Sequence, residues 1–468
     1  MVGDGVTLNT SAIQAAIDKL SKKGGGTLTV GPGRYLTGAI LMRSGVELHL
    51  EKGAVLLGST DINDYSDLRE SVEGAKLPLS VYSLALIQAH KATNIKLSGE
   101  GIIDGQGREL ALNIDSLHLK GIKTDPNYFT RLHRPRETAR PNLFSITNCK
   151  DVEISDLHCR NSACWGLVFV KCENLRIEGV DVFDRAYWNN DGFDIVDCHH
   201  VVVKDCHVDA ADDGICLKSD DPNDTNDDVL ITDCRVESSA SAIKFGTNSF
   251  GGFQNITIRN IQVKNTFRSA IAIEGVDGGI IRNVLVEHIT ATHTGNPIFI
   301  RLGKRHGKRV AVVENITIRN LTCDVPFERP DKGYDMRGPI DDTMRNPMPS
   351  SITGIPGAKV NNVVIENVCI TYPGRASKGV RYIPLWNIRQ IPEQQKAYPE
   401  FDMFGELPCY GFYVRHADGV TFRNISLKLD GEDFRPAFVL DDATNVTFDG
   451  ISYPMGKETN QIYDSSKQ

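Results

Sequence analysis

Two short stretches of the chain bring together the residue types that carry out acid–base chemistry. They are Asn189-Asn190-Asp191-Gly192-Phe193-Asp194-Ile195 and Ala211-Asp212-Asp213-Gly214-Ile215-Cys216-Leu217-Lys218. Aligning their glycines puts Asp191 over Asp213 and an asparagine over Asp212, with apolar side chains alternating behind them as in a β-strand. We therefore expect the three aspartates to converge at the entrance of two neighbouring strands.

Clustered carboxylates indicate chemistry more than folding, because each negative charge raises the cost of ionising the next. Hydrolysis of a glycosidic bond needs an acid and a base, about 6.5–9.5 Å apart in inverting enzymes. Neighbouring parallel strands are about 4.8 Å apart, and a diagonal step lengthens that separation towards the required range. A single Asp-Gly pair is explained by a turn, but three aspartates at one recurring position are not.

Composition excludes several classes of function. The chain has 468 residues, a net charge of −8 and no run of Lys or Arg, so nucleic-acid and membrane-surface partners have little support. No apolar stretch reaches the roughly 20 residues of a membrane helix. The first residues lack the apolar segment of a secretory signal, so export is either absent or encoded elsewhere.

The cysteines favour packing over cross-links or metal binding. There are eleven, an odd number, and most recur at matching positions before strands. Stacked, buried thiols explain this recurrence better than disulfides do. No Cys-x-x-Cys pair is present, so a zinc site is not expected.

A repeated motif sets the fold. A polar residue followed by alternating apolar residues recurs at intervals mostly in the twenties, at Asn94, Asp151, Asn174, His200, Asp228, Asn255, Asn283, Asn315, Asn362, Gly419 and Asn445. Such a unit, without intervening helices, is typical of one coil of a parallel β-helix. The sequence predicts an all-β, single-domain, right-handed parallel β-helix over residues 1–468, with a capping helix at about 9–23. Where the motif matches a glycosylation acceptor, an asparagine ladder at a bend is the preferred interpretation.

Three interruptions are longer than ordinary turns, at about 105–140, 325–358 and 373–410. Long loops on a rigid scaffold usually carry binding contacts or close a cleft. The last two loops are rich in arginine and aromatic residues, namely Arg337, Arg345, Arg381, Tyr382, Trp386, Arg389, Phe401 and Phe404. Such residues either bind sugars or pack the loop itself, and both interpretations stay open.

Continuing the alignment assigns one residue of each coil to the carboxylate column, namely Trp165, Asp191, Asp213, Ser241, Ser269 and Asn296. In the outward rows beside it we expect Lys218, Lys244, Glu274 and Arg301. The cations would neutralise the aspartates or hold an acidic substrate, with simple charge balance as the alternative. Trp165 and Trp188 flank the same place, to stack on a sugar ring or to pack under a loop.

These residues resemble glycoside hydrolase family 28, the polygalacturonases and rhamnogalacturonan hydrolases. The likeness covers the opening at residues 3–17, the segment 24–35 and the repeat. The family's N-T-D and D-D motifs match Asn189-Asn190-Asp191 and Asp212-Asp213. The resemblance implies an inverting, metal-free mechanism with Asp212 as general acid and with Asp191 and Asp213 on the attacking water. It also implies an extracellular or periplasmic location.

The chain departs from the family at two motifs. The family's G-H-G histidine falls on Ser241, and its R-I-K pair, which grips a galacturonate carboxylate, falls on Ala272 and Glu274. Lys244 and Arg301 are candidate replacements for that pair. We therefore expect the acid machinery to be kept and the contacts to the substrate to be altered.

Three functions remain in view. The preferred one is a hydrolase of pectic poly- or oligosaccharide, acting from a chain end, with no nucleic acid, membrane insertion or cofactor involved. A β-helix polysaccharide lyase would instead use the aspartates for calcium and release an unsaturated product. A carbohydrate-binding β-helix without activity is the third. The oligomeric state is left open.

Overall fold

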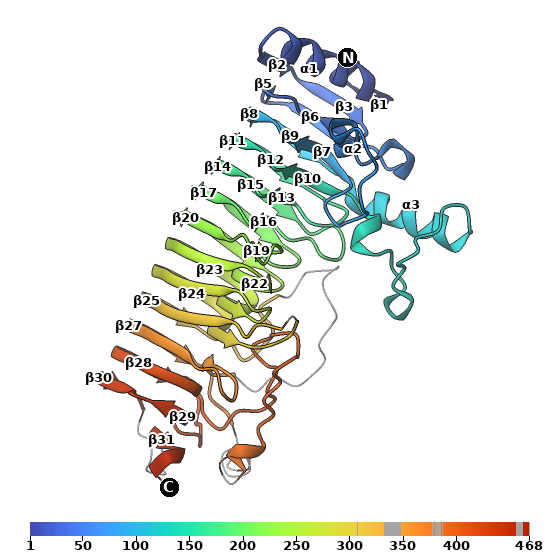
Figure 1. Cartoon of the computed structure of the whole chain (residues 1–468). Helices are drawn as coiled ribbons and strands as arrows, with labels where there is room; N and C mark the ends of the chain where they lie inside the picture. The colour runs from blue at the N-terminus through green and yellow to red at the C-terminus, as the bar shows by residue number, and fades with distance from the viewer. Residues whose placement is uncertain are drawn as a thin grey trace. The chain divides into compact units, whose positions relative to one another are not determined.

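The structure is a computed structural model, and it describes residues 1–306, 308–331, 348–376, 379, 385, 387–454 and 462–467 (Figure 1). The described residues form two compact units. Unit 1 comprises residues 1–215, and unit 2 comprises the described residues from 216 onward. The prediction of a single domain stays a prediction.

Unit 1 is a parallel β-helix in which most strands pair with the third strand along the chain. One column holds β2 (Gly26–Val30), β5 (Val46–Leu50), β8 (Thr93–Ser98), β11 (Lys150–Ser155), β14 (Glu173–Glu178) and β17 (His199–Lys204). A second holds β1 (Asp4–Leu8), β3 (Gly33–Thr37), β6 (Ala54–Gly58), β9 (Ile102–Asp104), β12 (His158–Arg160), β15 (Asp181–Asp184) and β18 (His207–Ala210). The third holds β4 (Ile40–Leu41), β7 (Ala85–His90), β10 (Asn142–Thr147), β13 (Leu167–Val170) and β16 (Phe193–Val196). The predicted β-helix is confirmed.

In unit 2 the strands are longer and run around the bends. Its strands are β20 (Asn226–Thr232), β21 (Arg235–Ser238), β22 (Ile243–Ser249), β23 (Gly252–Gly275), β24 (Ile280–Leu302), β25 (Val312–Asp324), β26 (Ser350–Thr353), β27 (Val360–Tyr372), β28 (Phe412–Leu429), β29 (Phe438–Thr444), β30 (Thr447–Ser452) and β31 (Ile462–Asp464). β19 (Ile215–Ser219) spans the boundary of the two units in sequence. β23 with β24, β24 with β25 and β27 with β28 again pair in parallel.

Asparagines make the bends of unit 2. Asn255, Asn283, Asn315 and Asn362 occupy one register column, and each has a φ between 53° and 57°. Asparagine enters this left-handed region more readily than other side chains with a Cβ. The Nδ2 of Asn283 also donates to the Oδ1 of Asn255, at 3.1 Å. The predicted asparagine ladder is confirmed, and it accounts for the acceptor-like Asn-x-Thr motifs.

A helix covers the first coil, as predicted. α1 (Thr10–Lys22) buries Ile13 and Ile17 and carries Lys19 and Lys22 in its last turn. The side chain of Gln14 pairs with the backbone of Leu41 in β4: its Nε2 donates to the carbonyl at 2.9 Å, and its Oε1 accepts from the N–H at 2.8 Å. An amide side chain thus takes the hydrogen bonds that a preceding strand would take.

The eleven cysteines are buried or half-buried thiols. In unit 1, Cys149, Cys172 and Cys198 stack on successive coils, and the backbone N–H of Cys172 donates to the Sγ of Cys198 at 3.3 Å. Burial raises the pKa of Cys149 to about 12, so its thiol stays protonated near neutral pH. The prediction of packed thiols is confirmed.

The first long loop contains helices that the sequence analysis did not predict. α3 (Gly107–Leu119) buries Leu110, Ala111 and Ile114, a helical spacing that was available in the sequence. Shorter helical turns are α2 (Arg69–Glu73), η1 (Ile62–Asp64), η2 (Thr130–Leu132), η3 (Glu137–Ala139), η4 (Ile388–Gln390) and η5 (Ser465–Lys467). Among the described residues, no helix is long and apolar enough to cross a membrane.

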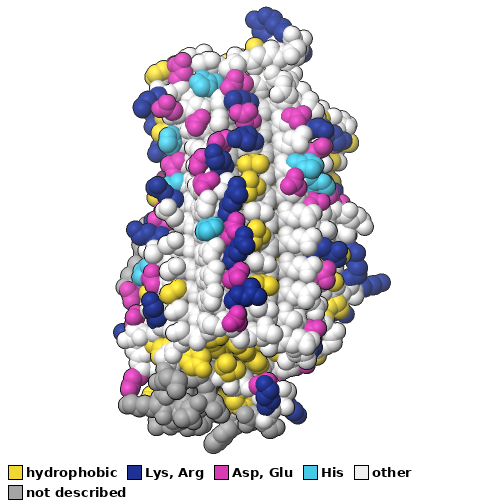
Figure 2. Space-filling model, turned by 90° about the vertical axis from the view of Figure 1, so that its left-hand side faces the viewer, with side chains coloured by type: hydrophobic (Ala, Val, Ile, Leu, Met, Phe, Trp, Pro, Cys, Tyr) yellow, Lys and Arg dark blue, Asp and Glu magenta, His cyan; other side chains and the backbone are white. Residues whose placement is uncertain are grey.

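Charges of opposite sign alternate from coil to coil on the surface. In unit 2, Arg259, Glu287, Arg319, Glu366 and Arg423 occupy successive places in one register column. Arg319 lies 2.7 Å from Glu287, and Arg423 lies 3.0 Å from Glu366. Figure 2 shows basic and acidic side chains interleaved in this manner over one face. Such cross-strand pairs favour the native register over slipped ones.

The asparagine ladder generates a prediction. We expect Asn283→Ala to lower the free energy of unfolding by about 1–2 kcal/mol, because alanine is strained at positive φ and loses the hydrogen bond to Asn255. Asn283→Gly is the matched control, since Gly419 occupies the same column with a φ of 72°. Urea unfolding of the three proteins measures both effects. Equal losses for the two variants would contradict a conformational origin.

Candidate active site

The coil-to-coil register brings Trp165, Asp191 and Asp213 to one column, as predicted. The N–H of Gly166 donates to the carbonyl of Asp191 at 2.8 Å, and the N–H of Gly192 donates to the carbonyl of Asp213 at 2.9 Å. The aspartates therefore occupy equivalent places on adjacent coils, where strands are about 4.8 Å apart. This pairing lies wholly within unit 1.

The glycine after Asp191 allows this close approach. A Cβ at position 192 would lie 2.3 Å from Cγ1 of Val208 and 2.5 Å from the carbonyl oxygen of Gly214. Both contacts are far inside van der Waals distance, so only glycine fits. The motif glycine is required by the stacking of coils that puts the carboxylates side by side.

The three aspartates differ in accessibility. Asp191 and Asp213 are each 4% exposed, whereas Asp212 is half-buried. The Oδ1 of Asp212 accepts from the backbone N–H of Asp213 at 3.1 Å. Asp212 is therefore the most open of the three carboxyl groups.

The register position of Asp212 carries a different side chain on the preceding coil. The pairing of Gly192 with Gly214 puts Asn190 beside Asp212, and the N–H of Asp212 donates to the carbonyl of Asn190 at 3.0 Å. Asn190 is fully buried, and its Nδ2 donates to the carbonyls of Ser162 and Cys164. One coil thus uses this position for a structural amide and the next coil uses it for an accessible acid.

Arg140 fixes the turn before Asp191. Its guanidinium is 1% exposed and donates to the carbonyls of Ala163 and Trp188, at 2.8 and 2.6 Å. It also donates to the Oδ1 of Asn189 at 2.8 Å. Trp188 and Asn189, both expected to contact the substrate, are held by this one side chain.

A second arginine of the same loop lies beside the turn. The guanidinium of Arg134 is 4.7 Å from the ring of Trp188 and donates to the Oδ1 of Asn189 at 3.1 Å. Arginine residues that could bind substrate were expected only in the two later loops. The signal was nevertheless present, since residues 131–140 contain four arginines, at 131, 134, 136 and 140.

Asp184, at the end of β15, was also not predicted. It is fully buried, its Oδ1 accepts from the N–H of Ser162 at 2.7 Å, and its Oδ2 has no hydrogen-bond partner. Burial raises the pKa of Asp184 well above its usual range, and Asp104 adds to the increase. Asp184 therefore holds its proton more tightly than an ordinary carboxyl group does.

Unit 2 carries the other predicted substrate contacts. Lys244, Ala272 and Phe299 share one row, and Glu274 pairs with Arg301, as the alignment predicted. The side chains of Lys218, Lys244 and Glu274 are buried, with exposed fractions of 7%, 2% and 2%. The Nζ of Lys244 lies 3.2 Å from the hydroxyl of Tyr398 and 4.0 Å from a carboxylate oxygen of Glu274. A role for these three residues in binding substrate stays a prediction.

Arg301 anchors a loop. It is 1% exposed, and its terminal nitrogens donate to the carbonyls of Gly354 and Glu393, at 2.8 and 2.6 Å. Its guanidinium also lies 5.1 Å from the ring of Phe404. Burial lowers the pKa of Arg301 to about 10. These contacts supply a structural reason for the cation, and its predicted contact with substrate stays a prediction.

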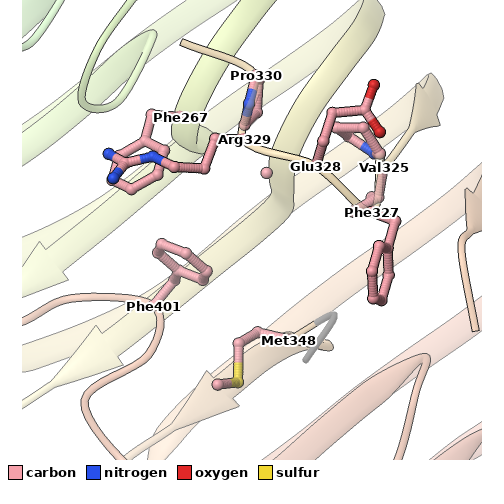
Figure 3. Close-up of a pocket in the computed structure, with 10 residues that line it drawn as sticks. Phe267, Val325, Phe327, Glu328, Arg329, Pro330, Met348 and Phe401 are labelled. Atoms are coloured by element: carbon pink, nitrogen blue, oxygen red, sulfur yellow. The ribbon is translucent and has the colours of Figure 1, made fainter. Parts of the chain in front are cut away.

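Two aromatic residues of the last long loop that were expected to contact sugars are packed instead. Phe401 and Phe404 are 4% and 5% exposed and belong to apolar clusters of unit 2. Figure 3 shows Phe401 and Met348 beside Phe267, over which Arg329 lies at 4.2 Å. The cavity among them is about 40 Å³, too small for a sugar ring. Of the other loop residues expected to bind sugars, Arg389 lies exposed in η4. The rest lie outside the described residues: Arg337, Arg345, Arg381, Tyr382 and Trp386.

Comparison with known proteins agrees with this geometry. The family model "Glycosyl hydrolases family 28" matches residues 56–325. A probable polygalacturonase of Vitis vinifera is 27% identical over 405 residues, which cover 81% of this chain and 74% of that protein. An exo-poly-alpha-D-galacturonosidase of Dickeya chrysanthemi is 28% identical over 241 residues, which cover 46% of this chain and 40% of that enzyme.

Solved structures agree on the fold. A family 28 exopolygalacturonase of Yersinia enterocolitica aligns with a TM-score of 0.72 at 20% identity, covering 97% of this chain and 77% of the other. The exopolygalacturonase of Thermotoga maritima aligns with a TM-score of 0.65 at 19% identity, covering 91% and 89%. The β-helix and its acidic turns define a glycoside hydrolase of the polygalacturonase-like class. The chain belongs to glycosyl hydrolase family 28.

The raised pKa of Asp184 leads to a prediction about how the stability of the protein depends on pH. The raised pKa of Asp184 means that the folded state keeps a proton that the unfolded state loses above about pH 4, so this residue lowers stability as pH rises. We expect Asp184→Asn to raise the free energy of unfolding by about 1 kcal/mol or more at pH 7. Below about pH 3.5, where both states are protonated, the two proteins should be similar. Thermal unfolding at several pH values measures this, and a difference that is independent of pH would contradict it.

Proposed function

We propose that this protein hydrolyses glycosidic bonds in pectic poly- or oligosaccharides that contain galacturonic acid, with inversion and from a chain end. The observation that carries this proposal is the placing of three carboxylates by successive coils of a family 28 β-helix. The relatives named above supply the substrate class, and the Dickeya enzyme supports action from a chain end.

Each aspartate has a role that fits its surroundings. Asp212, the most accessible, donates its proton to the leaving glycosidic oxygen as the bond from that oxygen to the anomeric carbon breaks. Asp191 and Asp213 hold the attacking water and take its proton as its oxygen bonds to the anomeric carbon. The proton count balances, since one proton leaves the acid and one arrives at the base.

Trp165, Trp188 and Asn189 complete the proposed site in unit 1. Trp165 and Trp188 are half-buried and therefore offer aromatic surface to a sugar ring. Asn189 has a φ of 58°, and its side-chain oxygen is fixed by Arg134 and Arg140. A pectic substrate lies in the cell wall, so we also propose that the protein is extracellular or periplasmic.

The central test replaces the proposed acid. We expect Asp212→Asn to lower kcat on polygalacturonan by about 10²–10⁴-fold, because the leaving oxygen then receives no proton. Release of reducing sugar measures turnover, and thermal unfolding checks that the fold is retained. Asp205→Asn is the matched control, because Asp205 lies in an ordinary turn where it pairs with Lys204 at 3.1 Å.

Three results would contradict the proposal. An unsaturated product formed only with calcium would indicate a lyase. Binding of pectic oligosaccharides without any turnover would indicate a carbohydrate-binding β-helix. Retention of the anomeric configuration, followed by NMR during hydrolysis, would exclude the inverting mechanism.

A further inference from the structure

The loop between β9 and β10 carries a buried charge to the candidate active site. Arg134 is 5% exposed although it belongs to a surface loop. An antiparallel bridge between Phe129 and Arg134 holds this part of the loop, with the N–H of Phe129 donating to the carbonyl of Arg134 at 2.9 Å. All of these residues belong to unit 1.

The contacts of Arg134 leave part of this buried cation unsatisfied. Its guanidinium lies against the rings of Trp188 and Phe129, its Nη1 donates to Asn189, and its Nη2 lies 3.5 Å from a carboxylate oxygen of Glu137. Its Nε is nevertheless buried without a hydrogen-bond partner. Burying an incompletely satisfied cation costs stability. Arg140 already anchors the same turn with two hydrogen bonds, so anchoring of the backbone alone does not explain a second buried arginine, which also adds repulsion between the two cations.

The charges around Arg134 include the proposed general acid. Burial lowers the pKa of Arg134, and the neighbouring charge of Arg140 lowers it further, whereas Glu137, Cys164 and Asp212 act in the opposite direction. Asp212 therefore lies within the electrostatic field of this guanidinium. Hydrogen bonds also connect Arg134 to Asp212 through two residues of the turn. Arg134 donates to Asn189, and the carbonyl of the adjacent Asn190 accepts from the N–H of Asp212.

We propose that Arg134 is a positioning residue of the hydrolytic site, one that orients Trp188 and Asn189 and sets the acid strength of Asp212. The proposal rests on the proposed function, since it assigns Asp212 as the general acid. The guanidinium is too well covered to be a primary ligand of the substrate. It acts through the turn that it contacts and through its charge.

The physical reason is a balance of charges. Asp191 and Asp213 lie on the adjoining register positions, and their negative charges make Asp212 harder to ionise. A general acid works best when its pKa lies near the working pH, and crowding by two carboxylates alone would make it too weak. A positive charge nearby opposes that effect. The field of Arg134 thus keeps Asp212 strong enough to give up its proton.

Three variants test this inference. Arg134→Met keeps a long side chain against Trp188 but removes the charge. Arg134→Lys keeps the charge but not the planar stacking or the same hydrogen bond. Arg136→Met is the matched control, because Arg136 lies on the same loop and stacks on Phe129 at 4.2 Å while its Nε donates to the carbonyl of Asn127.

The decisive measurement is the pH profile of kcat/KM on oligogalacturonides. Loss of the positive charge raises the pKa of Asp212, so Arg134→Met should move the alkaline limb upward by about one pH unit. Misplacement of Trp188 and Asn189 should also lower kcat about tenfold. Arg134→Lys should keep the wild-type limb with a lower kcat, and Arg136→Met should change neither.

A second measurement separates this inference from the proposed function. In protein labelled with ¹³C at the aspartate carboxyl groups, the resonance lost in Asp212→Asn identifies Asp212, and it should titrate at higher pH in Arg134→Met. Absence of hydrolysis by the wild-type protein would refute the proposed function, while this titration would still decide the effect of Arg134. An unshifted Asp212 titration together with lower thermal stability, or an equal shift in Arg136→Met, would overturn the inference.

Discussion

The parallel backbone hydrogen bonding between coils is the interaction on which the rest of the structure depends. A hydrogen bond from one coil to the next fixes which residues share a column, and a slip of one residue would turn every side chain to the opposite face. The bonds from Gly166 to Asp191 and from Gly192 to Asp213 show this constraint at the site. The carboxylates are neighbours because their backbones are paired, and no direct attraction between the side chains is needed.

The features that could be predicted from the sequence are those fixed by the pairing of coils. The alignment of the two Asp-Gly stretches, the register of Lys244 with Ala272 and the asparagine column all follow from the repeat, because a β-helix converts sequence period into spatial stacking. The packed thiols follow for the same reason. For a residue in the repeat, its place in the period gives its column in the β-helix.

The residues that were missed come from the aperiodic parts of the chain. Arg134 and Arg140 reach the turn from a loop whose path no repeat specifies, and α3 lies in the same interruption. The raised pKa of Asp184 depends on burial by residues from other coils, and the pattern of the sequence does not show that burial. Arg301 illustrates the converse, since its place in the column was predicted while its contacts with Gly354 and Glu393 were not.

The pairing of Gln14 with Leu41 has a consequence for the behaviour of the molecule in concentrated solution. Open strand edges of a solenoid are templates on which another chain can add, and end-to-end growth of this kind leads to fibres. By occupying both backbone groups of Leu41, the amide of Gln14 removes part of that template, and α1 carries it. The first helix therefore protects the protein from self-association as well as covering its apolar interior.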